Sequence, residues 1–213
     1  MNKDGELITL FSTPISKTNI GREFTKDETD FIQNIPMHKT PNRGMQNHGS
    51  VDLTLFDSHA DILKDIKKFI EYHLKQYLEE IEGVDTDLAK LRITQSWLNK
   101  NKPGENHNSH FHLNSYLSGV LYFKCLPNDG INFEDRSLGK FNNISFQRKK
   151  TTTWNSIGAT VSVEDGDLII FPSWVPHSVN RNETKNKERI SLSFNTFPVG
   201  ELGDYYRLTR LNL

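Results

Sequence analysis

Residues 165–177 read DGDLIIFPSWVPH, and this stretch decides the fold. An Asp-Gly turn feeds the apolar run Leu168–Phe171, which has the length of a buried strand and is too short for a helix. Pro172 and Pro176 then restrict the backbone of a short connection that delivers His177 in a fixed direction. A lone histidine beside apolar residues is usually an ordinary core or surface residue. Here the two prolines before it favour a ligand.

Further strand-like runs lie on both sides of this stretch, and turn signals rich in Pro, Gly, Asn and Asp separate them. We predict strands over Leu91–Leu98, Ser115–Cys125, Ile131–Glu134, Ile144–Phe146, Thr160–Val163, Asp167–Phe171 and Arg189–Phe197. No long helical pattern interrupts them. The pattern predicts a mainly β core over about residues 91–213, an antiparallel sandwich or barrel of the jelly-roll kind.

The clearest helix is predicted over Ser58–Glu82, where apolar residues recur at helical spacing and leave one polar face. Asp57 or Ser58 is placed to cap its start, and Gly83 is placed to end it in a left-handed conformation. We interpret this helix as a support that packs on a sheet.

Before this helix we predict three shorter segments: a strand over Glu6–Ile15 stopped by Pro14, a helix over Thr25–Ile35, and a loop over residues 36–50. Thr25 can cap its helix because Glu28 follows three residues later, as in a capping box. Residues 1–90 therefore form an N-terminal elaboration of helices and strands that supports the core. The length predicts a single domain over residues 1–213.

The composition argues against several classes of protein. The 213 residues carry 26 Lys and Arg against 27 Asp and Glu, so the formal charge of −1 disfavours a nucleic-acid binder. The single cysteine, Cys125, rules out an internal disulfide and a thiolate zinc site, so a transition-metal site must use imidazole from the eight histidines together with oxygen ligands. No apolar run reaches the roughly 18 residues of a membrane span, and the N-terminus lacks a signal-peptide pattern. We expect a cytoplasmic protein with no membrane partner.

Three of the eight histidines lie in Asn106–His112, NHNSHFH. In an extended chain His110 and His112 point to the same side, because side chains alternate with period two. Two imidazoles on one face form a chelating pair. His107 falls three residues before His110 and is therefore not expected on its face. The alternative is a polar loop whose histidines are only solvated.

The run that begins at Arg189, twelve residues after His177, alternates polar with apolar side chains. Arg189, Ser191, Ser193 and Asn195 share one face, while Ile190, Leu192 and Phe194 share the other. Burying a polar face that starts with an arginine is costly unless it meets an anion, and a guanidinium presents a planar fork to a carboxylate. The alternative is a solvent-facing strand. Its position after the His177 connection favours a pocket.

Together these elements resemble the Fe(II)- and 2-oxoglutarate-dependent oxygenases, and within them a subgroup that includes phage-encoded members. The segments that carry the likeness span nearly the whole chain: Leu10–Ile15 (LFSTPI), Ser96–Asn99 (SWLN), His110-x-His112 followed by Ser118–Tyr122 (SGVLY), Gly166–Ser173 (GDLIIFPS) and Arg189–Asn195 (RISLSFN). The family pattern is a His-x-Asp/Glu pair, a distant His, and an Arg or Lys roughly ten to a dozen residues later.

The resemblance implies that the jelly-roll core is a double-stranded β-helix of the cupin-like kind, and it implies a role for each matching residue. His110 and His177 match the two metal histidines of the family. The implied contacts to 2-oxoglutarate come from Arg189, which pairs with its far carboxylate, and from Ser191, Tyr122 and Asn99. One position departs from the pattern, because His112 stands where the family has its carboxylate ligand. Three neutral imidazoles still leave open positions on one side of a metal, so His110, His112 and His177 are the predicted ligands.

The implied function is that of a dioxygenase that hydroxylates an unidentified substrate, either a peptide side chain as in prolyl hydroxylases or a small metabolite. Its implied cofactors are Fe(II), 2-oxoglutarate as co-substrate and O₂, and succinate and CO₂ are released. Two alternatives stay open. One is a cupin-like three-histidine metal dioxygenase without 2-oxoglutarate, against which Arg189 and Ser191 argue. The other is a catalytically silent binding module, which His112 keeps open. The sequence leaves the oligomeric state undecided.

Overall fold

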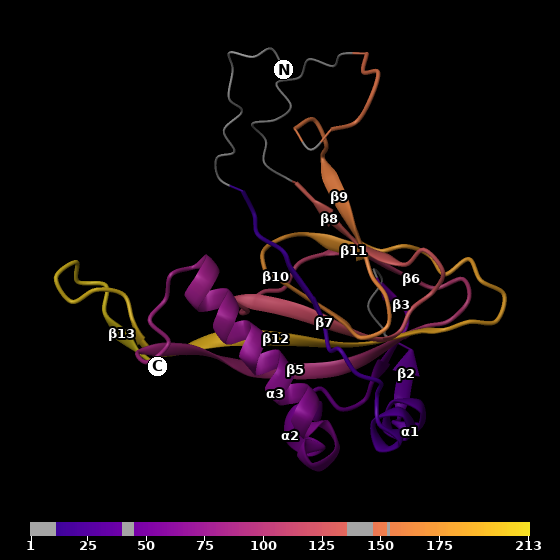
Figure 1. The fold of residues 1–213 in the computed structure, drawn as a ribbon, viewed down its shortest axis with the longest axis horizontal. Helices are drawn as coiled ribbons and strands as arrows, with labels where there is room; N and C mark the ends of the chain where they lie inside the picture. Colours follow the sequence, from indigo (N-terminus) through magenta and orange to yellow (C-terminus); the bar gives the residue numbers. More distant parts are fainter. Residues whose placement is uncertain (1–11, 40–44, 136–146, 153) are drawn as a thin grey trace.

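The structure is a computed structural model that describes residues 12–39, 45–135, 147–152 and 154–213. Its described strands form two antiparallel sheets that face each other (Figure 1). The larger sheet has the order β1 (Ser16–Asn19), β10 (Asp167–Pro172), β7 (Leu117–Lys124), β12 (Arg189–Leu202), β5 (Ala89–Asn101), β4 (His48–Ser50) and β2 (Met37–Lys39), with β13 (Leu211–Asn212) on the far end of β12. The smaller sheet has the order β3 (Met45–Gln46), β6 (Asn106–His110), β11 (His177–Val179), β8 (Gly130–Glu134) and β9 (Gly158–Ser162).

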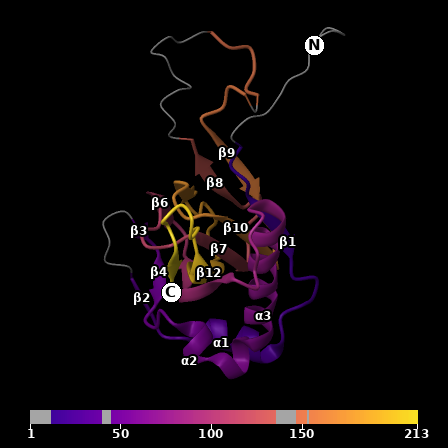
Figure 2. The same ribbon diagram turned by 90° about the vertical axis from the view of Figure 1, so that its left-hand side faces the viewer.

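Helices cover the outer face of the larger sheet (Figure 2). They are α1 (Lys26–Asn34), α2 (Leu55–Ser58), α3 (Ala60–Gln76) and the π-helical turn η1 (Tyr77–Ile81). Buried side chains of α3, among them Leu63, Ile66 and Ile70, pack in one cluster with Leu192 and Phe194 of β12. Helical spacing in one element and strand alternation in the other thus present matching apolar faces, which gives the sheet its support.

The predicted cap of the first helix is confirmed. The hydroxyl of Thr25 accepts the backbone N–H of Glu28 at 3.2 Å, and the Glu28 carboxylate accepts the backbone N–H of Thr25 at 2.8 Å. The start predicted for the long helix is wrong, because Ser58 is the last residue of α2 and His59 precedes α3 without a side-chain cap. The predicted end is confirmed, since Gly83 has a φ of +67°.

The strands predicted after residue 90 are confirmed where the structure describes them, with ends that shift by a few residues. Ile144–Phe146 lies outside the described residues, as do residues 6–11 of the first predicted strand, and β1 begins only at Ser16. The prediction of a loop over residues 36–50 is wrong. Residues of β2 and β4 pair with each other, and β4 pairs with β5, which lies some fifty residues further on in the chain; such long-range pairing leaves no local pattern.

The two faces of strand β12 have different surroundings: one faces the helix-covered core and the other faces the space between the sheets. Ile190, Leu192 and Phe194 belong to the helix-side cluster, while Arg189 and Ser191 face the other way. This is the alternation predicted from the sequence. Neighbouring Gly119 in β7 has no room for a side chain, because an added Cβ would lie 2.3 Å from Cζ of Phe194.

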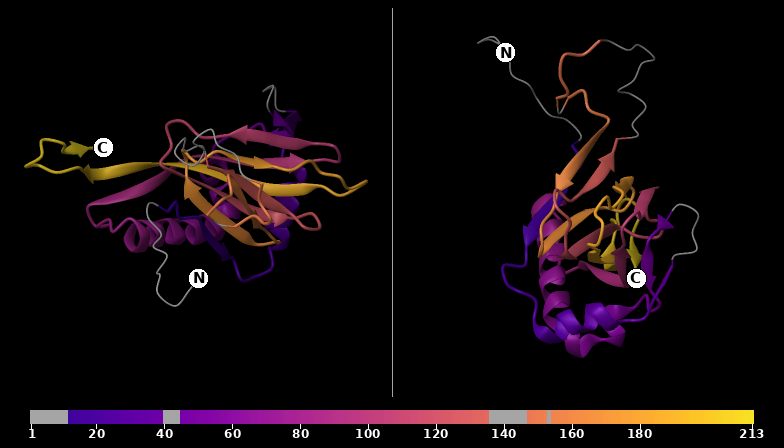
Figure 3. Two further views of the ribbon diagram at one scale, coloured as in Figure 1. Left: turned by 90° about the horizontal axis from the view of Figure 1, so that it is seen from above. Right: turned by 90° about the vertical axis from the view of Figure 1, so that its right-hand side faces the viewer.

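Beyond the sheets, β12 continues into a hairpin with β13 that projects away from the rest of the molecule (Figure 3). Within the described part of the chain, no helix combines the length and the apolar character needed to span a membrane. The cytoplasmic location and the single domain stay predictions.

Candidate metal centre and pocket

A pocket opens between the two sheets and holds about 510 Å³ of empty space, part of which is open to solvent. Polar side chains from both sheets line it: His107, His110, His112, His177, Asn99, Asn101, Ser118, Tyr122, Arg189, Ser191 and Ser193. Trp97, Val120, Ile131 and Phe171 add apolar walls. A concave, largely apolar space with converging polar groups is the usual form of a small-molecule site.

Three histidines converge at one part of this pocket. His110 ends β6, His177 starts β11 directly opposite it, and His112 follows just after β6. One ring nitrogen from each lies within 4.8 Å of the other two, and the Nε2 atoms of His112 and His177 are 3.3 Å apart. Two imidazole nitrogens bound to one ion at about 2.1 Å and at a right angle would be about 3.0 Å apart. The spacing therefore fits ligands on one side of a single metal ion.

Backbone carbonyls orient two of these rings. The carbonyl oxygen of Asn108 lies 2.8 Å from Nδ1 of His110, and that of Val175 lies 3.1 Å from Nδ1 of His177. A carbonyl can only accept, so each Nδ1 carries its hydrogen, and each Nε2 keeps a lone pair for a metal. The backbone N–H of His112 donates to the carbonyl of Ser173 at 2.9 Å, which holds the segment after β6 against the His177 connection.

Burial keeps these imidazoles neutral. Desolvation, followed by repulsion from neighbouring histidines, lowers the pKa of His112 to about 4 and that of His177 to about 3. Desolvation also lowers the pKa of His110, partly offset by its hydrogen bond to Asn108. Since only a neutral imidazole can bind a metal, the site is ready for a metal at neutral pH.

The depressed pKa values predict that acid weakens the metal-free protein. A histidine of the unfolded chain has a pKa near 6.5, so between pH 6.5 and about 4 the unfolded state binds more protons than the folded state. Stability should therefore fall as the pH drops through this window, by on the order of 1 kcal/mol per pH unit for each histidine. Urea unfolding at several pH values between 7 and 5 measures how steeply the free energy of unfolding depends on pH. His112→Phe should reduce that slope by the contribution of one histidine. An unchanged slope in that variant would contradict the assignment.

His107 lies in the same pocket, although the sequence did not predict it on the face of His110. Its ring stacks on that of His110, with centroids 4.4 Å apart and an interplanar angle of 19°. The cause is an irregularity in the pairing of β6 with β11, where His110 lies opposite His177 and His107 lies opposite Val179. Two residues of β6, Asn108 and Ser109, thus lie opposite the single residue Ser178 of β11, and this bulge brings His107 back to the pocket face.

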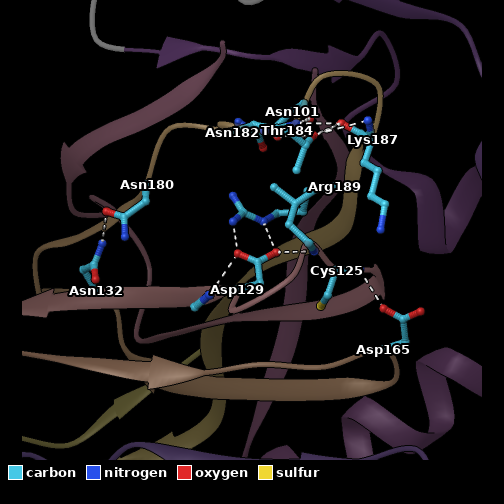
Figure 4. A network of polar contacts seen from close by, with 12 residues as sticks. Asn101, Cys125, Asp129, Asn132, Asp165, Asn180, Asn182, Thr184, Lys187 and Arg189 are labelled. Carbon is cyan, nitrogen blue, oxygen red and sulfur yellow. Dashed lines mark hydrogen bonds and ion pairs between the residues drawn. The ribbon is translucent and has the colours of Figure 1, made fainter. Parts of the chain in front are cut away.

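Arg189 reaches the pocket from β12 but is already paired. Its Nε and Nη2 donate to the two carboxylate oxygens of Asp129, with an Nε–Oδ2 distance of 2.6 Å (Figure 4). Both side chains are at most 3% exposed. The same carboxylate accepts the backbone N–H groups of Leu126, at 3.0 Å, and of Gly130, at 2.8 Å. Asp129 is therefore held in place by its own turn and holds the guanidinium in turn.

This pairing leaves the other edge of the guanidinium free. A guanidinium carries five N–H groups, of which Asp129 takes one on Nε and one on Nη2. Nη1 is buried and has no hydrogen-bond partner among the residues that the structure describes. A buried donor without a partner costs about 1–3 kcal/mol, so this orphaned atom fits a carboxylate ligand in the pocket.

The structure places the other predicted co-substrate residues in the same pocket. Ser191 and Tyr122 are buried there, and burial raises the pKa of the Tyr122 phenol above its ordinary value. Asn99 is buried as well, but its amide is used: Nδ2 donates to Ser193 at 2.9 Å, and Oδ1 accepts from Asn47 at 3.0 Å. Asn99 is thus the predicted contact least available for a ligand.

Sequence reasoning missed Asp129, Asn101 and the pocket position of His107. Asp129 stands in the turn Pro127-Asn128-Asp129-Gly130, where an aspartate is expected for local reasons, and nothing in that turn indicates a partner sixty residues away. Asn101 could have been predicted, because it lies two residues after Asn99 in the same strand and therefore on the same face. The bulge that turns His107 has no signal in the residue pattern.

Residues 95–195 match the family model described as "Putative 2OG-Fe(II) oxygenase". The family resemblance predicted from the sequence is therefore confirmed over this segment. No curated protein matches the chain.

Several solved structures share the fold. A prolyl hydroxylase from Trichoplax adhaerens, in complex with a hypoxia inducible factor oxygen degradation domain peptide fragment, has a TM-score of 0.59 and 10% identity, covering 86% of this chain and 83% of that one. The non-heme alpha ketoglutarate dependent carbocyclase SnoK from nogalamycin biosynthesis has a TM-score of 0.57 and 11% identity, covering 94% and 88%. HygX from Streptomyces hygroscopicus, with nickel and 2-oxoglutarate bound, has a TM-score of 0.53 and 10% identity, covering 86% and 82%. The predicted jelly-roll fold is confirmed.

Proposed function

We propose that the protein is a hydroxylase acting on a peptide side chain or a small metabolite, on the premise that residues 95–195 match the family model of 2-oxoglutarate- and iron(II)-dependent oxygenases. The observation that carries the proposal is the pairing, in one pocket, of a three-histidine cluster with a buried arginine that has a free edge. A metal site alone would serve a cupin-like dioxygenase. The arginine adds a place for a second carboxylate, which such an enzyme does not need.

The cofactors of this family are Fe(II), with 2-oxoglutarate and O₂ as co-substrates. His110, His112 and His177 would hold the metal through neutral ring nitrogens, and Asn108 and Val175 keep two of the rings in orientation. Three protein ligands on one side leave positions open on the other side. When bound, Fe(II) and 2-oxoglutarate would supply the oxidising chemistry. That chemistry converts O₂ and 2-oxoglutarate to succinate and CO₂ and inserts one oxygen atom into a C–H bond of the substrate.

Arg189 would bind the carboxylate of 2-oxoglutarate that lies farthest from the metal. Asp129 fixes one edge of the guanidinium, so the free edge with Nη1 faces the pocket without rotational freedom. Ser191 and the Tyr122 hydroxyl are further donors in the same buried space. The apolar wall that includes Ile131 and Phe171 excludes water from the bound co-substrate.

The charges of the described groups suit a dianion. The three histidines are neutral, and the positive charge of Arg189 is balanced by Asp129. With a divalent ion the pocket would carry two positive charges, which equals the charge of a dicarboxylate with the sign reversed. The formal charge of −1 for the whole chain agrees with a substrate other than nucleic acid.

Turnover of 2-oxoglutarate tests the proposal. Protein loaded with Fe(II) and supplied with O₂ and 2-oxoglutarate should form succinate in excess over protein, and His177→Ala should not. Peptides and metabolites that are substrates should increase succinate formation and gain one oxygen atom, detected by mass spectrometry. Bound iron and bound 2-oxoglutarate without any succinate would contradict the assignment as an oxygenase and favour the silent binding module.

A further inference from the structure

Unpartnered buried polar atoms of the described residues gather at the pocket. Among the described residues, four buried side-chain atoms have no hydrogen-bond partner: Asn47 Oδ1, Asn101 Nδ2, His107 Nε2 and Arg189 Nη1. The last three belong to residues that line the pocket, and Asn47 contacts the pocket residue Asn99. Each such atom is a cost to the folded chain. Their concentration at one place indicates a ligand that completes them.

Two of these atoms lie on directly paired strands. Asn101 at the end of β5 is the register partner of Arg189 at the start of β12. Side chains of such partners point to the same face, with Cβ atoms about 4.5–5.5 Å apart. Both side chains are buried, with 2% of each residue exposed. The close-up shows Arg189 with both Asn101 and Asp129 drawn near it, and Asp129 bound to its guanidinium (Figure 4).

The backbone around Asn101 is fixed independently of any ligand. Its carbonyl oxygen accepts Nδ2 of Asn182 at 2.9 Å, and the same Asn182 amide donates to the carbonyl of Lys187 at 2.7 Å (Figure 4). Asn182 is fully buried, although it lies in a stretch of charged, solvated residues. The Asn101 side chain is thus held by the backbone at the pocket end and makes none of these structural contacts through Nδ2.

The third atom approaches from the smaller sheet. His107 is turned to the pocket by the bulge in β6 and is stacked on the metal-site residue His110. It therefore stands next to the histidine cluster, while Asn101 stands next to Arg189. Both side chains line the pocket that also contains the histidine cluster and Arg189.

We propose that Asn101 and His107 are co-substrate-positioning residues, which join Arg189 in binding the carboxylate of 2-oxoglutarate that lies away from the metal. The inference rests on the proposed function, and it adds two residues to the Ser191, Tyr122 and Asn99 contacts that the resemblance implies. The amide and guanidinium N–H groups are donors, and a neutral imidazole can carry its one N–H on Nε2, so a carboxylate is the ligand class that can accept from all three side chains.

The test compares two ligands on Fe(II)-loaded protein without oxygen. Calorimetric titration gives the affinity for 2-oxoglutarate and for pyruvate, a 2-oxo acid that lacks the second carboxylate. Asn101→Leu and His107→Phe should each weaken 2-oxoglutarate binding by about 10- to 100-fold, the value of one hydrogen bond to a charged group, and leave pyruvate and Fe(II) affinities unchanged. His107→Gln should recover part of the loss, and His73→Phe, a change on α3 outside the pocket, should have no effect.

Thermal unfolding of the ligand-free variants separates positioning from a structural role. Because Asn101→Leu removes an unsatisfied buried donor, its melting temperature should stay equal or rise while 2-oxoglutarate affinity falls. A fall in both would mean that Asn101 only supports the fold. If 2-oxoglutarate affinity is unchanged in both variants, or pyruvate binding weakens equally, this inference is overturned while the proposed function stands. Wild-type protein that binds Fe(II) but no 2-oxoglutarate would overturn both.

Discussion

Arg189→Met should lower the free energy of unfolding of the metal-free protein by about 3–5 kcal/mol. The substitution leaves the Asp129 carboxylate, whose side chain is 1% exposed, without its countercharge inside the protein. Two backbone N–H groups, of Leu126 and Gly130, still bind it, but they do not neutralise it. Urea unfolding, followed by far-UV circular dichroism at pH 7, measures the loss.

The double variant Arg189→Met/Asp129→Asn is the matched control. Removing both charges should restore most of the stability, because a neutral amide needs no countercharge. It should also bind Fe(II) like wild type but have lost affinity for 2-oxoglutarate, since the histidines are intact and the guanidinium is gone. A single variant within about 1 kcal/mol of wild type, or a double variant that is no more stable than the single one, would contradict a buried ion pair.

His177→Ala should lower the affinity for Fe(II) by more than about 100-fold. Replacing a residue that only orients a metal ligand already lowers metal affinity by about 10- to 100-fold, and loss of a ligand should cost more. His177 is 4% exposed and is the most buried of the three candidate ligands. Its ring also packs edge-on against Phe171, with centroids 4.6 Å apart. Anaerobic titration with Fe(II), with metal content determined on desalted protein, measures the change.

His112→Ala is the second arm of this experiment, because position 112 is where the chain departs from the family pattern. If His112 is a ligand, its removal should also weaken Fe(II) binding, and His112→Asp should keep the metal by restoring a carboxylate. Unchanged iron stoichiometry and affinity in His112→Ala would show that His112 is no ligand. His73→Phe, far from the pocket, controls for the loss of a histidine as such.

This site has a carboxylate on Arg189 and none among the candidate metal ligands of the described residues. The family pattern has an aspartate or glutamate on the metal, where this chain has His112. A carboxylate is nevertheless present beside the pocket residue Arg189, to which Asp129 is bound. The summed charge of the metal-loaded pocket is therefore the same as with a carboxylate ligand and an unpaired arginine. This balance explains how a three-histidine site and a dianionic co-substrate are compatible.

The strands were predictable because they depend on local pattern. Asp167–Phe171 is a short apolar run, and the polar and apolar residues of Arg189–Phe197 alternate, so both show their burial in the sequence itself. Strands β2 and β4 are polar and short, and they form because β5 offers its edge. The break between α2 and α3 at His59 likewise lies within a stretch whose apolar spacing continues without interruption.

The sequence predicted which histidines form the candidate metal site, but it did not predict all the side chains that line the pocket beside them. His110, His112 and His177 meet as alternation and the rigid proline connection predict. What the sequence did not contain is register: the bulge that turns His107, and the pairing that sets Asn101 opposite Arg189. Both depend on how distant strands align, which residue spacing within one strand does not encode.

We infer that one pocket of this protein binds Fe(II) and 2-oxoglutarate together. The most direct measurement is the visible absorption of the anaerobic protein with Fe(II), before and after 2-oxoglutarate is added. We predict a metal-to-ligand charge-transfer band that requires both components, survives in His73→Phe, and is lost in the double variant Arg189→Met/Asp129→Asn at limiting 2-oxoglutarate. Protein that binds Fe(II) stoichiometrically but develops no such band at saturating 2-oxoglutarate would contradict the claim.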